Sequence, residues 1–430
     1  MTRITAFVFV LMCCMVAGCS EKSAVTNEPG GNGQPEPNPL QLTATELSIV
    51  DNTNEFAFKL FKEVCENTSV DSNVFLSPIS ASYALTMTAN GANGPTYDSM
   101  IQTLQLGGLS LADINEGYHN LTHILTHADT GVTFTIANSF WSRQGKQIQP
   151  QYVATAQDYY DARVQEIDIY QPWAVDTINQ WVKDNTNNKI SSIVRPPLEF
   201  ASLLLNAIYF KGNWRYEFDT THTYTQPFHL PNGTTKDWDI MYLAAEDIMQ
   251  GTEEQPVLNP DVKVLSNSEV NMIALPYGDE GFEMLVLTPP YQSTVDDLLA
   301  GLSSQKLDSW VRQLTVDRFM LALPRMKFSY EILLNDRLKA MGMNIAFDPS
   351  RCDLSRMFVD GVGWIDKVRQ KTFVQVDEKG TEAAAVTSVV TVDSMPPYID
   401  GTRPFLFIIR ESQCGAILFM AKIADPLWES

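Results

Sequence analysis

The spacing of apolar residues changes several times along the chain, which predicts a mixture of helices and strands. Residues 47–66 carry apolar side chains close to helical spacing, and this pattern predicts an amphipathic helix. Ser77 followed by Pro78 is typical of a helix start, because serine can cap a first turn and proline suits its first position. Two further helices are expected, one over residues 178–182 with its exit at 186–190 and one over residues 330–341.

Strands dominate the second half of the chain. Residues 132–141 alternate between apolar and polar side chains, and residues 203–212 form a continuous apolar run that is typical of a buried strand. Further strands are expected at 271–288, as a pair about the turn 278–281, at 321–328, and as a buried pair at 405–409 and 416–421. The sequence has no tandem repeat, so the pattern predicts an α+β fold.

One segment near the carboxyl end combines a strand pattern with loop boundaries. Residues 381–392 contain neither Pro nor Gly, but Gly380 precedes them and a Met-Pro-Pro sequence follows at 395–397. One face of this segment carries only small or β-branched side chains, namely Thr381, Ala383, Ala385, Thr387, Val389 and Thr391. Glu382 lies on the other face, where water can solvate it. The segment is either a loop that is able to become a strand or an ordinary edge strand followed by a turn.

The first residues are predicted to be a targeting signal rather than part of the fold. Residues 1–18 combine a positive start with a short apolar run, and the sequence Val-Ala-Gly-Cys at 16–19 resembles a bacterial lipobox, in which Cys19 receives a diacylglyceryl group. The alternative is a plain secretory signal with an incidental cysteine. Residues 19–43 are then the lipidated cysteine and a tether rich in Gly, Pro, Asn and Glu, and residues 44–430 are the folded domain. This organisation predicts a lipid anchor in a bacterial cell envelope, at the outer membrane and exposed on the surface.

Composition limits the possible partners. The chain has 430 residues, of which 44% are hydrophobic, and this length alone suggests two or three domains. The formal net charge of −21 disfavours direct binding to nucleic acid or to an anionic lipid surface.

Residues suited to metal binding or catalysis are few. Once the signal is removed and Cys19 carries lipid, the remaining cysteines are widely spaced and include no CxxC pair. We therefore expect buried apolar thiols rather than a zinc site or disulfides. His119, His123 and His127 recur at i, i+4 and i+8, as in a metal-binding helix face or a solvated one; we expect the solvated face and no metal. Neither GxSxG nor HExxH occurs, so we expect neither an enzyme nor a cofactor.

Short motifs distributed over residues 44–428 together resemble the serpin family of protease inhibitors. They include Asn73, Ser77-Pro78, Ser80, Gly91-Ala92, Asn138, Ile178-Asn179 with Trp181-Val182, Asn206 to Gly212, Trp214, Phe218, Leu275 to Tyr277, Leu323-Pro324, Gly342-Met343, Glu378 to Ala385, Arg403 to Phe405 and Asp425-Pro426. The resemblance implies one domain of three β-sheets and about nine helices with an exposed reactive-centre loop, in place of the several domains suggested by length.

The resemblance also implies a mechanism. A target protease, serine or cysteine, attacks the loop and forms an acyl-enzyme; the cut loop then enters the main sheet as a strand and traps the protease in a covalent complex. The hinge through which the loop enters would comprise Glu378, Gly380, Thr381, Glu382, Ala383, Ala384 and Ala385. A monomer is expected. The alternative is a non-inhibitory surface binding protein with the same fold, and the small hinge residues favour inhibition.

The resemblance assigns two further sites. Ser77, Ser80 and Asn206 would form a polar latch where the sheet opens, together with Trp214 and with Gln370 at a position where the family usually has histidine. The bond cleaved by the protease lies at Asp393–Ser394 or at Ser394–Met395, depending on whether the count starts from Pro404 or from Glu378. Val390 to Val392 would suit an elastase-like pocket and Asp393 an acid-specific one, and we favour elastase-like or broad-range serine proteases.

Overall fold

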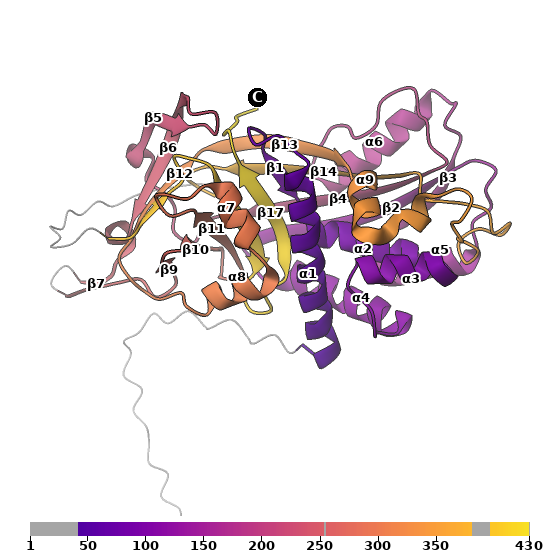
Figure 1. The fold of residues 1–430 in the computed structure, drawn as a ribbon, viewed down its shortest axis with the longest axis horizontal. Coiled ribbons are helices and arrows are strands. Elements are labelled where there is room, and N and C mark those ends of the chain that lie inside the picture. The colour runs from indigo at the N-terminus through magenta and orange to yellow at the C-terminus, as the bar shows by residue number, and fades with distance from the viewer. Residues whose placement is uncertain (1–41, 253–254, 381–395, 430) are drawn as a thin grey trace, which may run out of the picture. The chain divides into compact units, whose positions relative to one another are not determined.

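Helices gather in the amino-terminal part of the described chain and strands dominate the remainder (Figure 1). The computed structural model describes residues 42–252, 255–380 and 396–429. Its α-helices are α1 (Ala44–Glu66), α2 (Pro78–Ala89), α3 (Gly94–Thr103), α4 (Leu111–His127), α5 (Pro150–Tyr160), α6 (Trp173–Asn185), α7 (Val295–Gly301), α8 (Ser304–Val311) and α9 (Asn335–Leu338). None of the helices in these described ranges is long and apolar enough to cross a membrane.

The strands form three sheets of four to six strands and one separate hairpin. The six-stranded sheet has the order β1 (Val74–Leu76), β17 (Ile417–Ile423), β16 (Phe405–Glu411), β11 (Phe282–Thr288), β10 (Asn271–Tyr277) and β9 (Lys263–Ser266). The four-stranded sheet has the order β15 (Tyr398–Asp400), β12 (Met320–Pro324), β6 (Thr235–Ala244) and β5 (Thr223–His229). The five-stranded sheet has the order β13 (Met326–Leu333), β14 (Lys367–Val376), β4 (Ser202–Gly212), β2 (Val132–Arg143) and β3 (Arg163–Ile167). The hairpin pairs β7 (Gln250–Thr252) with β8 (Gln255–Val257).

The five-stranded sheet is covered on both faces, which explains the continuous apolar run of β4. Leu203, Leu205 and Ala207 belong to a cluster with α6 on one face. Leu204 and Ile208 alternate with them and belong to the main core on the other face. A strand buried on both sides has no reason to place polar residues at every second position.

Most predicted elements are present, with ends that differ by a few residues. The helix predicted at 47–66 begins earlier, at Ala44, because Thr43 and Glu46 form a capping box ahead of the apolar pattern. The predicted pair within 271–288 is the antiparallel pair β10 and β11, and β16 pairs with β17 near the carboxyl end.

Between residues 321 and 341 one prediction was wrong and another was correct only in part. The single strand at 321–328 is two strands in different sheets, β12 and β13, because Pro324 ends one ladder and the Arg325 N–H donates to the Asp239 carbonyl. The helix predicted over 330–341 begins later, since β13 continues to Leu333, and it is formed by α9 at Asn335–Leu338 and the π-helical turn Lys339–Met343 that follows. A strand period followed directly by a short helix produced an apolar spacing that resembles a longer helix.

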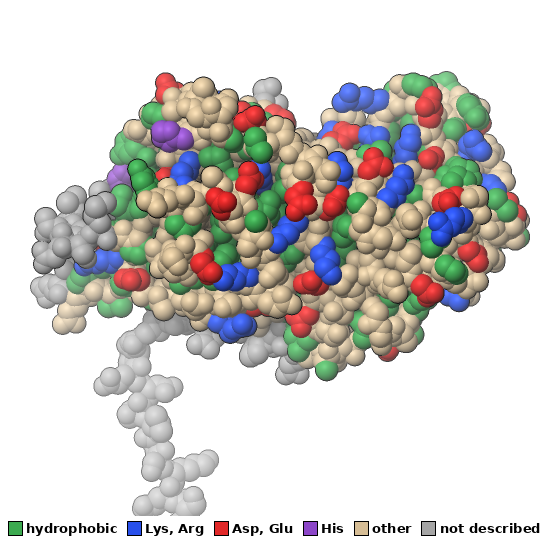
Figure 2. Space-filling model, in the orientation of Figure 1, with side chains coloured by type: hydrophobic (Ala, Val, Ile, Leu, Met, Phe, Trp, Pro, Cys, Tyr) green, Lys and Arg blue, Asp and Glu red, His purple; other side chains and the backbone are tan. Residues whose placement is uncertain are grey.

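The surface carries charges of both signs. On the face shown in Figure 2, acidic and basic side chains are interspersed over most of the described elements. The acidic side chains on this face are therefore spread among basic ones rather than gathered into one patch.

Candidate functional site

The central feature of the five-stranded sheet is the junction of β4 and β14, which is closed at one end and open at the other. The two strands are parallel and pair only from Lys367 opposite Leu203 to Lys371 opposite Ala207. Beyond these five pairs, β4 continues to Gly212 beside β2, and β14 continues to Val376 beside β13. Residues 208–212 and 372–376 therefore border an unpaired space, which we call the gap.

The gap is a real cavity and not only a separation of ribbons. A pocket of about 220 Å³ is lined by residues 209–212 of β4 and 373–376 of β14. Its remaining lining comes from the six-stranded sheet below, through Phe75, Tyr277, Ile409 and Phe419, and from Trp214 and Gly380 at the open end. A strand inserted here would run antiparallel to both neighbours, as a chain that leaves β14 and turns back must do.

A short segment after α6 crosses the outer side of the gap. The Asn187 side-chain amide donates to the Tyr209 hydroxyl of β4 at 3.3 Å. The Lys189 ammonium lies 5.6 Å from the centre of the Phe373 ring of β14, and the Lys371 ammonium donates to the Ser192 carbonyl. Residues 187–192, which we call the strap, thus contact both borders of the gap through side chains.

The chain that leaves β14 is fixed above the open end. The Trp214 indole N–H donates to the Asp377 carbonyl at 2.9 Å, and the Phe218 N–H donates to the Glu378 carbonyl at 2.8 Å. Gly380 has a φ of 54°, and a Cβ there would lie 2.1 Å from the Trp214 nitrogen, so only glycine fits. Residues 377–380, which we call the hinge base, therefore end beside Trp214 at the open end of the gap.

Glu378 is the charged anchor of the hinge base. Its side chain is buried, with the residue only 6% exposed, and it accepts a hydrogen bond of 2.7 Å from the Thr223 hydroxyl. Its second oxygen lies 3.4 Å from the Arg325 Nε, between the two strands β12 and β13. A buried carboxylate with these partners ties the hinge base, which follows the five-stranded sheet, to the four-stranded sheet.

The predicted latch lies at the closed end, and Gln370 is its centre. The Gln370 side chain accepts from the Ser77 N–H at 3.0 Å and donates to the Ser77 carbonyl at 2.8 Å, which is a matched pair for an amide. The Ser77 hydroxyl donates to the Leu418 carbonyl instead of capping α2, contrary to our expectation for the helix start. Gln370 therefore joins β14 to the start of α2.

Asn206 takes part in the latch through a partner that the sequence did not indicate. It lies opposite Gln370 on one side and opposite Asn138 of β2 on the other, so three polar residues form one row across the sheet. The Asn206 side-chain Nδ2 donates to the side-chain Oδ1 of Asn138 at 2.7 Å. Ser80 lies buried on α2, and its hydroxyl has no hydrogen-bond partner within the described part of the chain. Trp214 lies outside this row of polar residues, and its indole binds the hinge base.

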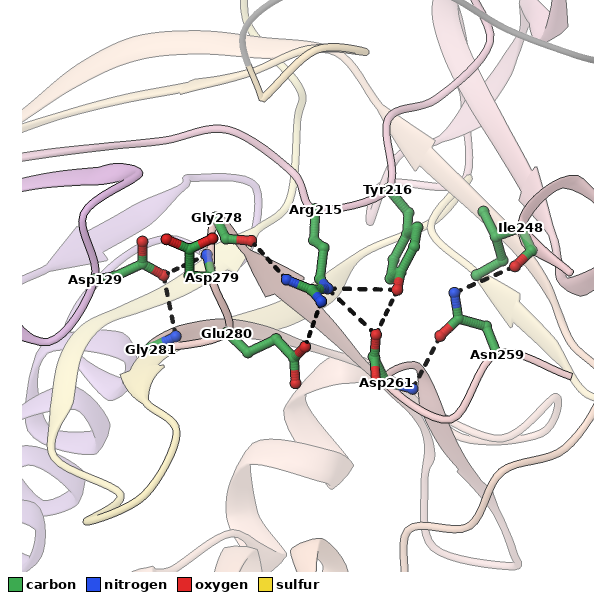
Figure 3. A network of polar contacts seen from close by, with 10 residues as sticks. All are labelled: Asp129, Arg215, Tyr216, Ile248, Asn259, Asp261, Gly278, Asp279, Glu280 and Gly281. Atoms are coloured by element: carbon green, nitrogen blue, oxygen red, sulfur yellow. Dashed lines mark hydrogen bonds and ion pairs between the residues drawn. The ribbon is translucent and has the colours of Figure 1, made fainter. Parts of the chain in front are cut away.

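A polar network fixes the segment that follows β4 (Figure 3). The Arg215 guanidinium lies 2.9 Å from a Glu280 oxygen and 3.2 Å from an Asp261 oxygen, and it donates to the Gly278 carbonyl. Asp129 accepts from the Asp279 and Gly281 N–H groups at 2.8 and 3.0 Å, and from the Gly131 N–H at 2.7 Å. The network connects the open end of β4, the β10–β11 turn and the start of β2.

The protonation states within and beside this network follow from burial. Burial and the nearby Asp261 raise the pKa of Glu280, and burial also raises the pKa of Tyr216, whose hydroxyl donates to Asp261. Burial raises the pKa of Tyr277 well above its usual value, so the ring that stacks on Trp214 stays uncharged. The Tyr277 side of the gap is therefore uncharged, whereas Lys189 and Lys211 line the gap elsewhere.

Comparison with known proteins decides the family. The sequence model described as Serpin (serine protease inhibitor) matches residues 51–426. The chain belongs to the serpin family. Serpins are inhibitors rather than catalytic enzymes, and they form covalent complexes with target proteases.

Individual relatives cover nearly the whole folded part. Serpin B8 of Bos taurus is 31% identical over 395 residues, which cover 88% of this chain and 100% of the bovine protein. The leukocyte elastase inhibitor of Xenopus laevis is 29% identical over 388 residues, which cover 86% of this chain and 97% of that protein. The crystal structure of a thermophilic serpin, tengpin, in the native state has a TM-score of 0.77 at 25% identity, over 91% of this chain and 97% of that one. The predicted serpin fold, with three sheets and nine helices among the described residues, is confirmed.

Several predicted site residues lie outside the described part of this serpin. They are the hinge residues Thr381, Glu382, Ala383, Ala384 and Ala385, the candidate cleavage residues Asp393, Ser394 and Met395, and Cys19. Glu378 and Gly380 are described, and both lie at the hinge base. The five-stranded sheet, the gap and the latch are described completely.

Sequence reasoning missed four contributors to the site. Asn138 had been noted only as a family match, Arg325 was an unremarked charge within a strand pattern, and the strap followed a predicted helix. Each acts through a neighbour that is distant in sequence, so local spacing contained no signal for its role. Thr223 was missed for the same reason.

Proposed function

We propose that this serpin is a suicide-substrate inhibitor of serine proteases. The observation that carries the proposal is the gap between β4 and β14, with the hinge base fixed above its open end. A protease that cleaves the following segment near Asp393 or Ser394 forms an acyl-enzyme. The released segment then pairs with β4 and β14 and draws the attached protease along.

The sequence of the entering segment supports this role. On one face it carries Thr381, Ala383 and Ala385 followed by Thr387, Val389 and Thr391, all small or β-branched. Each ladder hydrogen bond formed contributes a net of about 0.5–1.5 kcal/mol, so an insertion of many residues provides a large driving force. The native state is then metastable and is maintained by a kinetic barrier.

The target class follows from the residues before the cleaved bond. Val390, Thr391 and Val392 suit a small apolar pocket, and a 29% identical relative is described as a leukocyte elastase inhibitor. We therefore propose elastase-like or broad-range serine proteases as targets. Asp393 makes an acid-specific protease, serine or cysteine, the second candidate.

The location proposed for the protein is the bacterial cell envelope. The sequence Val-Ala-Gly-Cys at 16–19 supports lipidation of Cys19, with residues 19–43 as a tether that lifts the inhibitor from the outer membrane. Replacing Cys19→Ala should move the protein from the membrane fraction to the soluble fraction. Retention of the variant in membranes contradicts lipid anchoring at this residue.

One incubation tests the proposed inhibition. Mixing the protein with a serine elastase should give a complex that survives SDS and boiling, and mass spectrometry of its loop fragment identifies the bond. Cleavage without any complex would favour the alternative, a non-inhibitory serpin that binds partners at the surface. A cysteine protease in parallel shows whether the range is broader.

A further inference from the structure

Three of the five histidines of the chain lie in one exposed row on α4. His119, His123 and His127 are spaced by four residues each, so neighbours in the row are one helical turn apart. All three are exposed to solvent. The row lies apart from the gap, and no step of the proposed inhibition uses it.

The hydrogen bonds of His127 define which of its ring nitrogens carries the proton. Its Nδ1 lies 2.8 Å from the His123 carbonyl oxygen and 3.1 Å from the Thr126 hydroxyl oxygen. The Thr126 hydroxyl has a single proton, and the Thr122 carbonyl, 2.8 Å away, accepts it. Both groups beside Nδ1 are therefore acceptors, so Nδ1 carries the proton and Nε2 keeps its lone pair.

A histidine held in this way is prepared to bind a metal ion. Metal-binding histidines almost always donate the other ring N–H to a carbonyl or carboxylate, which fixes the tautomer and the ring orientation. In His127 the His123 carbonyl performs this function, and the free lone pair on Nε2 is the metal-binding atom.

His123 supplies a second ring at a suitable distance. The His123 and His127 rings are 4.3 Å apart between centres and nearly parallel, at 18°. Two nitrogens that bind one ion at 2.0–2.1 Å lie on the order of 3.5 Å from each other, so rotation of the exposed His123 ring must bring one of its nitrogens to that separation from the His127 Nε2. The His119 ring instead lies edge-on to Tyr159, 6.3 Å away between centres.

We propose that His123 and His127 together bind one divalent transition-metal ion, of the class that includes Zn²⁺, Ni²⁺ and Cu²⁺. Imidazole nitrogen suits these ions, and affinity should increase towards Cu²⁺. Within the described ranges, no group of three or more His, Cys, Asp or Glu side chains could hold a metal, so this site has two protein ligands and water completes the coordination. The spacing alone had led us to expect no metal, and the position of the proton reverses that expectation.

Calorimetric titration of the full chain with CuCl₂ and with ZnCl₂ tests the site. We expect one ion per chain, and weaker binding of Zn²⁺ than of Cu²⁺. His123→Gln and His127→Gln should each weaken Cu²⁺ binding by about tenfold or more, because a second ligand on the same scaffold acts as an intramolecular binding event. His119→Gln is the matched control on the same helix face and should leave the affinity unchanged.

Two results would overturn the proposal. One is Cu²⁺ binding that persists in the double variant His123→Gln with His127→Gln, and the other is an equal loss on replacing His119. Circular dichroism of each variant checks that α4 remains folded. Nitrogen-15 spectra of the imidazoles give an independent reading, since they should place the metal-free His127 proton on Nδ1, and a proton on Nε2 removes the basis of the site.

Discussion

The two halves of the β4–β14 junction have the same strands and neighbours but are held in different ways. In the closed half, five residue pairs form a ladder, and Gln370 joins it to α2 through two hydrogen bonds. In the open half, the borders are connected only through side chains of the strap and through the hinge base. Within its ten residues, β14 therefore has one end that is paired with β4 and one end whose edge towards β4 is unpaired.

This difference teaches how a sheet can be stable and still accept another strand. The ladder and the latch prevent β4 and β14 from separating as a whole. The gap meanwhile leaves the facing edges of β4 and β14 unpaired at the end where the hinge base lies.

A charge at the start of the entering segment should have the largest effect. Thr381→Arg should still permit cleavage by the protease but lower the yield of covalent complex by about tenfold or more, because the arginine would enter the sheet without a partner. Glu382→Arg is the matched control on the opposite face and should inhibit normally. Densitometry of SDS gels measures both, and unchanged inhibition by Thr381→Arg contradicts insertion.

Removing the anchor of the hinge base should weaken the open end. Glu378→Ala loses the hydrogen bond from Thr223 and the pair with Arg325, at a cost of about 2–3 kcal/mol in the free energy of unfolding. Asp239→Ala serves as the control, since Asp239 is half exposed and lies 3.9 Å from Arg325, and it should cost less than about 1 kcal/mol. Urea unfolding compares the two, and equal costs would show that Glu378 is not an anchor.

Truncating the latch should weaken the closed end. Gln370→Ala leaves the buried Ser77 N–H without its partner, and we expect a loss of about 2 kcal/mol in urea unfolding. Wild-type stability within the error of the measurement would exclude Gln370 as the latch.

Replacing Gln370→His should make the latch depend on pH. Burial lowers the pKa of a histidine in the folded state below its unfolded value of about 6.5, so the unfolded state binds more protons. The extra stability of the variant is then present above pH 6.5 and is lost as pH falls through the folded pKa. Urea unfolding at several pH values should show this slope in the variant relative to the wild type, and parallel curves would contradict it.

Loosening the strap should have the smallest effect. Lys189→Ala removes the contact with the Phe373 ring, which is worth about 0.5–1 kcal/mol at an exposed site. We expect faster hydrogen exchange at residues 372–376 and a slightly faster formation of the protease complex. Lys183→Ala, on α6 itself, is the matched control, and equal exchange in both variants would remove the strap from the mechanism.

The sequence predicted the strand and the hinge of this site better than the side-chain contacts that hold them. The apolar run of β4 and the hinge composition near Gly380 are local signals, because burial on two faces and a positive φ each restrict the residues at one place. The Asn138–Asn206 pair depends instead on strand register, and the Glu378–Arg325 pair on how the four-stranded and five-stranded sheets meet. The exchange of sheets at Arg325 was missed because one apolar period continues across it.

The five residue pairs that join β4 to β14 would also limit the rate of insertion if the loop inserts as proposed. The first residues to enter would fill the gap without breaking any ladder bond between these strands, whereas the next ones must separate Lys371 from Ala207 and then Gln370 from Asn206. Separation of the closed half then sets the time that complete insertion takes. A protease whose acyl bond outlasts this unzipping is captured, and one that hydrolyses the bond sooner departs and leaves a spent inhibitor.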